Sequence, residues 1–305
     1  MLDMIVVGGG PAGMTAALYA CRNGKSVMVI EKNGFGGQIT HSPKVENYPG
    51  TLQMSGSEFA DRLLEQILAQ GAQIEFETVR GVSDGGDVKT VTTEEGGRYE
   101  ARTVVLATGV KHRMLGLPGE NELVGEGISF CAVCDGDFYK GKDVCVAGGG
   151  NSALQEALLL AEKCRSVTIL QDLPRCTGEQ RLQELLEARD NVVIRTNTRI
   201  TGLEQRDGAL CAVLAEDAAT GAPERFACDG LFVAIGLIPE NQAYAELAEL
   251  NAYGYFASGE DCLTRTPGVY CAGDCRAKTV RQLATAIADG ATAALAACHY
   301  LNESR

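Results

Sequence analysis

The sequence predicts an α/β fold with two Rossmann-like modules, the second inserted into the first. One observation is an internal repeat: an apolar run, a glycine-rich turn and an amphipathic stretch follow one another near the start of the chain and again from residue 143. The other is a late apolar run at residues 269–274, whose place before the last amphipathic stretch suggests that the chain returns to the first module. The expected domains are residues 1–114 with 243–305, and residues 115–242.

The first repeat begins with an apolar strand at residues 3–7, which runs into the turn GGGPAG at residues 8–13 and then into a helical pattern. In a dinucleotide-binding βαβ unit such glycines let the backbone approach a pyrophosphate at the helix N-terminus. A second strand, residues 26–30, ends at Glu31, whose carboxylate would accept hydrogen bonds from ribose hydroxyls and repel a 2′-phosphate. The sequence therefore predicts an FAD or NAD site that includes Gly8, Gly10, Pro11, Ala12, Gly13 and Glu31.

The second repeat has the same order, with a strand at residues 143–147, the turn GGGNSA at residues 148–153, a helical pattern and a strand at residues 166–170. Two glycine turns, each between a strand and a helix, are stronger evidence than a single motif. The position equivalent to Glu31 is Gln171, and Asp172 follows it. The second module is therefore expected to bind a pyridine nucleotide through Gly148, Gly150, Asn151, Ser152, Gln171 and Asp172.

Composition restricts the partners and the compartment. The 305-residue chain has a net charge of −13, which disfavours nucleic acid and anionic membranes because both require a basic surface. No basic segment or small-residue cleavage site precedes the first strand, and no apolar stretch long enough to span a membrane is free of charge or glycine. The expected localisation is cytoplasmic.

Most of the twelve cysteines are scattered and are expected to be small buried residues kept reduced in a cytoplasm. Cys131 and Cys134 differ, because two cysteines separated by two residues can close a readily exchanged disulfide. The alternative is half of a zinc site, which requires a second cysteine or histidine pair. The nearest candidate is Cys271 with Cys275, far along the chain, so we expect no metal.

Together these motifs resemble those of the low-molecular-weight thioredoxin reductases over essentially the whole chain. The most specific is CAVCDG at residues 131–136, just before the second glycine turn. Glutathione-reductase-like relatives have their cysteines in the first module, so this placement separates the two branches. The other matching segments are GGQ at 36–38, VENYPG at 45–50, ATG at 107–109, AIGLIP at 234–239, AGD at 272–274 and RQLATA at 281–286.

The resemblance implies an FAD-dependent thioredoxin-disulfide reductase, a homodimer whose second module rotates relative to the first. Cys134 is then the sulfur that faces the flavin, and Cys131 is the thiol that attacks thioredoxin or a thioredoxin-like protein. Asp135 is the general acid and base, which requires an environment that raises its pKa. The implied FAD residues outside the first turn are Gly37, Gln38, Asn47, Thr108, Gly109, Asp274, at the ribitol chain, Arg281, and Gln282 and Leu283, at the flavin ring.

One segment departs from the family pattern. NADPH-dependent members carry His-Arg-Arg and a further Arg after the second strand of the second module, where they hold the 2′-phosphate. Here the segment is QDLPRCT at residues 171–177, and Asp172 would repel a phosphate. Three donors stay open: NADH, with its ribose on Gln171 and Asp172; NADPH, with help from Arg175; and reduced ferredoxin, with a vestigial nucleotide site.

Two other functions fit the same residues. A flavin dithiol oxidase would transfer electrons from a small dithiol to O2, and a redox sensor would bind FAD without turnover. The intact second glycine turn argues against the oxidase, and the CxxCD motif argues against the sensor.

Overall fold

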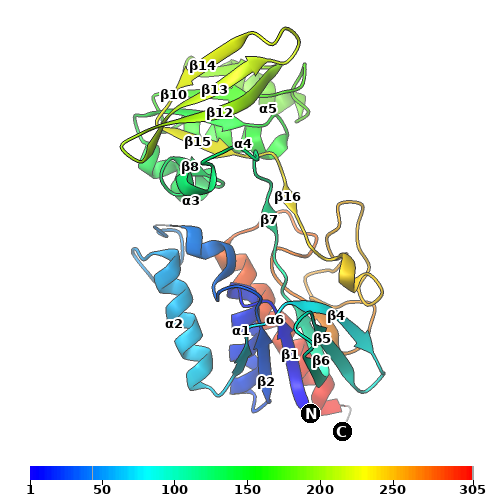
Figure 1. Ribbon diagram of the computed structural model, residues 1–305. Helices are drawn as coiled ribbons and strands as arrows, with labels where there is room; N and C mark the ends of the chain where they lie inside the picture. Colours follow the sequence, from blue (N-terminus) through cyan, green and yellow to red (C-terminus); the bar gives the residue numbers. More distant parts are fainter. Residues whose placement is uncertain (43, 304–305) are drawn as a thin grey trace. The chain divides into compact units, whose positions relative to one another are not determined.

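The computed structural model describes residues 1–42 and 44–303 and divides the chain into two compact units. Unit 1 comprises Met1–Lys111 and the chain from Ile238 onward, and unit 2 comprises His112–Leu237. The chain crosses between the units at two short strands, β7 (Lys111–His112) and β16 (Leu237–Ile238) (Figure 1).

Unit 1 is built on a seven-stranded sheet of order β3-β2-β1-β6-β5-β4, in which β17 also pairs with β6. The strands β3, β2, β1, β6 and β17 are parallel. β5 pairs antiparallel with the first half of β6, and β4 pairs antiparallel with β5 at the edge of the sheet. The strands are β1 (Leu2–Val7), β2 (Val27–Ile30), β3 (Gln73–Glu75), β4 (Val79–Asp84), β5 (Lys89–Thr93), β6 (Arg98–Leu106) and β17 (Val269–Cys271).

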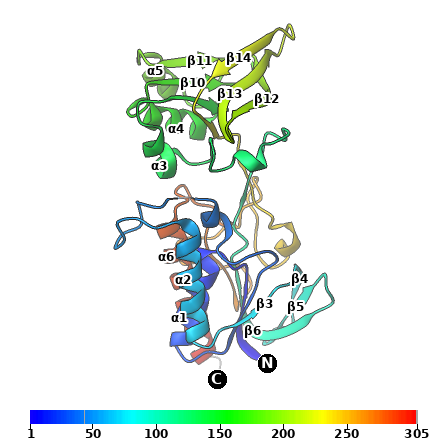
Figure 2. The ribbon, with the colours of Figure 1, turned by 60° about the vertical axis from the view of Figure 1, so that its left-hand side comes forward.

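Three helices cover one face of this sheet, with α1 packed against both α2 and α6 (Figure 2). α1 (Pro11–Arg22) begins with a proline, which has no N–H to leave unpaired at a helix start. α2 (Gly56–Ala69) is capped by the Ser55 hydroxyl, which accepts from the N–H of Glu58. α6 (Leu283–Glu303) approaches α1 closely.

Unit 2 has a five-stranded parallel sheet of order β11-β10-β9-β15-β8 and a separate antiparallel sheet, β12-β13-β14. α4 and α5 pack on one face of the parallel sheet, and the antiparallel sheet packs on the other. Its elements are β8 (Ile128–Ser129), α3 (Ala132–Asp135), β9 (Asp143–Ala147), α4 (Asn151–Ala161), β10 (Ser166–Leu170), α5 (Gln180–Glu187), β11 (Val192–Arg195), β12 (Thr198–Arg206), β13 (Ala209–Asp217), β14 (Pro223–Ala227) and β15 (Gly230–Val233).

A parallel sheet with crossover helices in each unit confirms the predicted α/β class. In both units the glycine turn follows the carboxyl end of the central strand, which is where such sheets bind ligands. Short 3₁₀ helices lie at Gly37–His41, Asn121–Leu123, Gly136–Tyr139 and Gln242–Tyr244. Within residues 1–42 and 44–303, no helix is both long and apolar enough to cross a membrane.

Candidate active site

Cys131 and Cys134 form a disulfide at the start of α3, with their Cα atoms 5.3 Å apart. Cys131 is the N-cap of this short helix, and its sulfur accepts a hydrogen bond from the backbone N–H of Cys134 at 3.2 Å. Both cysteines are half-buried, and Val133 between them is exposed. A backbone donor is therefore in place for a thiolate on Cys131, because an N–H at a helix start favours the charged sulfur.

Asp135 ends α3 and lies in a chain of hydrogen bonds with the redox turn. Its Oδ2 accepts from the Ser129 hydroxyl at 2.7 Å, and the Ser129 oxygen accepts from the N–H of Cys131 at 3.1 Å. Its Oδ1 is buried and has no partner among the described residues. Burial raises the pKa of Asp135, although the bond from Ser129 opposes the shift. An environment suited to an acid and base is therefore present.

Glu156, on α4, is a second carboxyl beside the disulfide, and sequence reasoning missed it. Its Oε2 is buried without a hydrogen-bond partner among the described residues, and α4 packs against α3, the helix of the redox turn. Burial raises the pKa of Glu156 to about 8; the nearby backbone N–H of Ala132 opposes this shift and the charge of Asp135 adds to it. A signal was present in the sequence: Glu156 shares a helical stripe with the buried Ala153 and Leu160.

The first glycine turn is tightly packed on one side and open on the other. Gly8 has a φ of +105°, and a Cβ on Gly13 would lie 1.9 Å from the Gly8 carbonyl oxygen. Gly10 faces open space. Glu31 lies beside the turn, where its Oε2 accepts from the N–H of Gly9 at 2.7 Å. The open side of Gly10 at the start of α1 suits the close approach of a phosphate.

Four further FAD candidates meet near the start of α6. The side-chain amide of Asn47 donates to Gln282 Oε1 at 3.3 Å. Arg281 donates from Nε to the carbonyl of Asp274 at 3.3 Å, and its guanidinium lies 4.3 Å from the centre of the Tyr255 ring. The Oδ1 of Asp274 is buried without a hydrogen-bond partner among the described residues and lies 3.8 Å from the Lys278 ammonium; burial raises the pKa of this carboxyl.

The remaining candidates of unit 1 also lie at turns and helix starts. Thr108 donates from its hydroxyl to Asn241 Oδ1 at 2.7 Å, and the Asn241 amide donates to the carbonyl of Cys275, so this buried asparagine links three segments. Sequence reasoning missed Asn241. The other candidates are Pro11 and Ala12 at the start of α1, Gly37 and Gln38 in the first 3₁₀ helix, Gly109 with a φ of +65°, and Leu283 at the start of α6.

The second glycine turn resembles the first in its backbone but not in its side chains. Gly148 has a φ of +115°, close to that of Gly8. Gln171, unlike Glu31, is buried: it packs against Gly149 and donates from its amide to the carbonyl of Arg175 at 3.4 Å.

The outer side of this second turn carries the other nucleotide candidates. Asn151 accepts from the N–H of Glu179 at 2.7 Å and donates to its carboxylate at 3.2 Å. Asp172, Asn151 and Ser152 are exposed, and Gly150 precedes α4 as its N-cap. Of the two residues expected at the ribose, Asp172 is therefore the exposed one.

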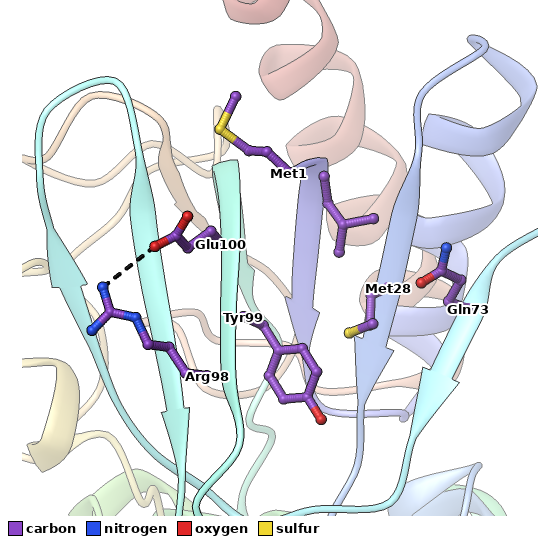
Figure 3. Close-up of a pocket in the computed structure, with 7 residues that line it drawn as sticks. Met1, Met28, Gln73, Arg98, Tyr99 and Glu100 are labelled. Atoms are coloured by element: carbon purple, nitrogen blue, oxygen red, sulfur yellow. Dashed lines mark hydrogen bonds and ion pairs between the residues drawn. The ribbon is translucent and has the colours of Figure 1, made fainter.

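A surface pocket of unit 1 lies elsewhere (Figure 3). It is lined by the first residues of β1, β2, β3 and β6, among them Arg98 and Glu100, whose side chains form an ion pair at 3.3 Å. This end of the sheet is opposite to the carboxyl ends of the parallel strands, where α/β folds bind their ligands. The pocket is therefore separate from the residues described above.

Comparison with known proteins identifies a matching family, similar sequences and a similar solved structure. The family model of the pyridine nucleotide-disulphide oxidoreductases matches residues 2–290. The chain is 36% identical to the thioredoxin reductase of Bacillus subtilis, over 99% of this chain and 95% of the relative. It is 38% identical to that of Treponema pallidum, over 98% and 97% of the two chains. The crystal structure of thioredoxin reductase from Streptococcus pyogenes superposes with a TM-score of 0.94, at 37% identity and 99% coverage of each chain.

Proposed function

Since the chain belongs to the pyridine nucleotide-disulphide oxidoreductase family, and within it to the thioredoxin reductases, we propose how its residues divide the work of an FAD-dependent thioredoxin-disulfide reductase. Unit 1 holds FAD, and unit 2 carries the disulfide and a pyridine nucleotide site. Bound FAD would carry two electrons between the donor and Cys131–Cys134, and this pair reduces thioredoxin or a thioredoxin-like protein. The observation that carries this proposal is the closed Cys131–Cys134 disulfide with the half-buried Asp135 beside it.

Reduction of the disulfide takes up two electrons and two protons and yields two thiols. Cys134 is the sulfur that receives the electrons, and Cys131 leaves as a thiolate that the N–H of Cys134 stabilises. Asp135 holds the proton that this chemistry requires, because burial keeps its carboxyl protonated at higher pH than usual. The Cys131 thiolate then attacks the partner's disulfide, and Cys134 resolves the mixed disulfide, so that the partner leaves as a dithiol.

The residues of unit 1 fit an FAD. Gly10 is open beside the N-terminus of α1, which suits the pyrophosphate. The buried Oδ1 of Asp274 has no hydrogen-bond partner among the described residues, which suits a hydroxyl donor from the ribitol chain. Bound FAD supplies the two-electron carrier. Arg281 and Gln282 are held by Tyr255 and Asn47 at the start of α6, where they would line the ring. The rest of the proposed site is Gly8, Pro11, Ala12, Gly13, Glu31, Gly37, Gln38, Thr108, Gly109 and Leu283.

For the donor we favour NADH. Asp172 is exposed beside the second glycine turn, where a carboxylate accepts from ribose hydroxyls and repels a 2′-phosphate. Gln171 faces inward and supports the turn rather than the ligand. The rest of this site is Gly148, Gly150, Asn151 and Ser152. The active assembly is a homodimer, which light scattering of the FAD-loaded protein would test.

The first experiment is an anaerobic titration of the FAD-loaded protein with NADH and, separately, with NADPH, followed by flavin absorbance. Fast bleaching by NADH, then reduction of thioredoxin, supports the proposal. Bleaching by NADPH alone overturns the assignment of Asp172. Bleaching by neither, with ready reduction by ferredoxin, means that unit 2 does not serve a nicotinamide. Oxygen consumption with a dithiol alone would identify a dithiol oxidase instead.

A further inference from the structure

The segment that follows β10 folds back against the second glycine turn. The backbone N–H groups of Thr177 and Gly178 both donate to the carbonyl of Gly149, at 2.8 and 2.9 Å. A Cβ on Gly178 would lie 3.0 Å from the backbone nitrogen of Asn151, the first residue of α4. The segment therefore lies directly against the helix start at which the diphosphate of a nucleotide is expected to bind.

Glu179 is the next residue of this segment, and it is bonded to Asn151 in both directions. Its backbone N–H donates to Asn151 Oδ1 at 2.7 Å, and its carboxylate accepts from the Asn151 amide at 3.2 Å. The side chain of Glu179 is otherwise exposed to solvent. A negative charge of the protein itself is thus held beside the amino-terminal end of α4, the end of a helix that favours anions.

Unit 1 has a neutral side chain at the matching place. There the N–H of Gly36 donates to the carbonyl of Gly9 at 2.8 Å, the same bond that Thr177 forms with the middle glycine of the second turn. Two residues after each donor stand Gln38 in unit 1 and Glu179 in unit 2. At this position the module expected to hold FAD therefore has an amide, whereas the module expected to hold the donor has a carboxylate.

We infer that Glu179 restricts the nucleotide site of unit 2: its carboxylate, held by Asn151, stands where the diphosphate approaches α4 and lowers the affinity for nicotinamide dinucleotides. The inference rests on the proposed function, because it requires a nucleotide site at the second glycine turn. A diphosphate is negatively charged, so it repels the carboxylate and has to displace it from Asn151. Asp172 acts on a 2′-phosphate, whereas Glu179 acts on the diphosphate that NADH and NADPH share.

The test is isothermal titration calorimetry of the full-length, FAD-loaded protein with NAD⁺ and, separately, with NADP⁺, neither of which can reduce the flavin. Glu179→Gln keeps the size of the side chain and an acceptor for Asn151 but removes the charge. This variant should bind both nucleotides about fivefold more tightly than wild type at low salt, as for two unit charges about 4 Å apart in water. The gain should shrink in about 1 M sodium chloride, where the screening length falls to about 3 Å.

The matched control is Glu184→Gln, which changes the net charge equally. Glu184 is exposed on α5, where its carboxylate accepts from the Gln180 amide at 3.2 Å, and its replacement should leave both affinities unchanged.

Three results would overturn the inference while leaving the nucleotide site in place: equal affinities in wild type and Glu179→Gln, a gain that salt does not reduce, or a gain for NADP⁺ alone. No binding by wild type or by any variant would overturn the nucleotide site and the inference together. Binding by Glu179→Gln but not by wild type would support the inference and would mean that the wild-type protein takes its electrons from another donor.

Discussion

Replacing Asp289 with asparagine should destabilise unit 1 far more than its conservative character suggests. The Asp289 carboxylate, on α6, accepts from the N–H of Gly273 at 3.0 Å, from Arg276 at 2.9 and 2.8 Å, and from Lys278 at 3.0 Å. The side chains of Arg276 and Lys278 are only 3% and 6% exposed. Asparagine has one acceptor oxygen and no charge, so it would leave the two buried cations with only their longer ion pairs, Arg276 to Glu260 at 3.3 Å and Lys278 to Asp274 at 3.8 Å.

Breaking a buried ion pair in this way typically costs about 3–5 kcal/mol. The chain offers a matched control, Glu260→Gln. Glu260 pairs with the same Arg276 at 3.3 Å, but its side chain is 92% exposed, and exposed pairs contribute about 0–1 kcal/mol. Asp289 also anchors Gly273, the residue before Asp274, so the Asp289→Asn variant should retain FAD less well than the control.

The difference in the free energy of unfolding between wild type and Asp289→Asn should depend on pH. Burial alone would raise the pKa of Asp289, but the hydrogen bonds from Arg276 and Lys278 hold it below its usual value. A carboxyl with a depressed folded pKa stabilises the protein above its unfolded pKa of about 3.9, and this contribution is lost as the pH falls through the folded value. The gap between wild type and Asp289→Asn should therefore be full at pH 7 and shrink below about pH 4.

Urea unfolding followed by thiol labelling would resolve this effect by unit. Cys262 is buried and its sulfur donates to the backbone carbonyl of Asp289, so it reports on unit 1, whereas the buried Cys164 reports on unit 2. The labelling midpoint of Cys262 should fall sharply in Asp289→Asn, and that of Cys164 should not. Equal Cys262 midpoints in Asp289→Asn and Glu260→Gln would refute the assignment of a buried ion cluster.

Three further changes test the site. Cys134→Ser should abolish thioredoxin reduction while the visible flavin absorbance stays, and residual full activity would mean that another group receives the electrons. Asp172→Arg should raise the ratio of NADPH to NADH use at least about tenfold, as expected for a new charge-assisted bond to the 2′-phosphate. The charge-matched control is Asp190→Arg, at an exposed position. An unchanged ratio in Asp172→Arg would contradict the assignment. Gly13→Ala should cost about 1–3 kcal/mol, because its Cβ would meet the Gly8 carbonyl, while Gly34→Ala, which has open space, should be nearly neutral by urea unfolding.

The two βαβ repeats were predictable because their signals are local. A glycine turn between an apolar strand and an amphipathic helix is readable from neighbouring residues, and the structure has α1 and α4 directly after Gly10 and Gly150. The antiparallel strands β12, β13 and β14 were not identified. These pairings depend on partners that local periodicity does not specify.

The site residues also differ in how far the sequence alone could predict them. The Cys131–Cys134 pair follows from its spacing, and Asp135 from the resemblance to the thioredoxin reductases; the disulfide is closed in the structure. Asn241 and Glu156 could not be assigned in this way, because Asn241 bonds to Thr108, distant in sequence, and Glu156 comes near Asp135 only in the folded chain. The inward direction of Gln171 was equally unpredictable, since the sequence alone did not specify the packing of its side chain against Gly149.

The pairing of β17 with β6 has a consequence for how the chain acquires its structure during synthesis. Residues 104–106 of β6 lie between β1 and β17 in the finished sheet, but β17 leaves the ribosome only after the whole of unit 2. Unit 2 is continuous and can fold as soon as it emerges, whereas the nascent first unit must wait with one apolar strand edge unpaired. Newly made chains are therefore most exposed to aggregation in the interval between the translation of β6 and that of β17.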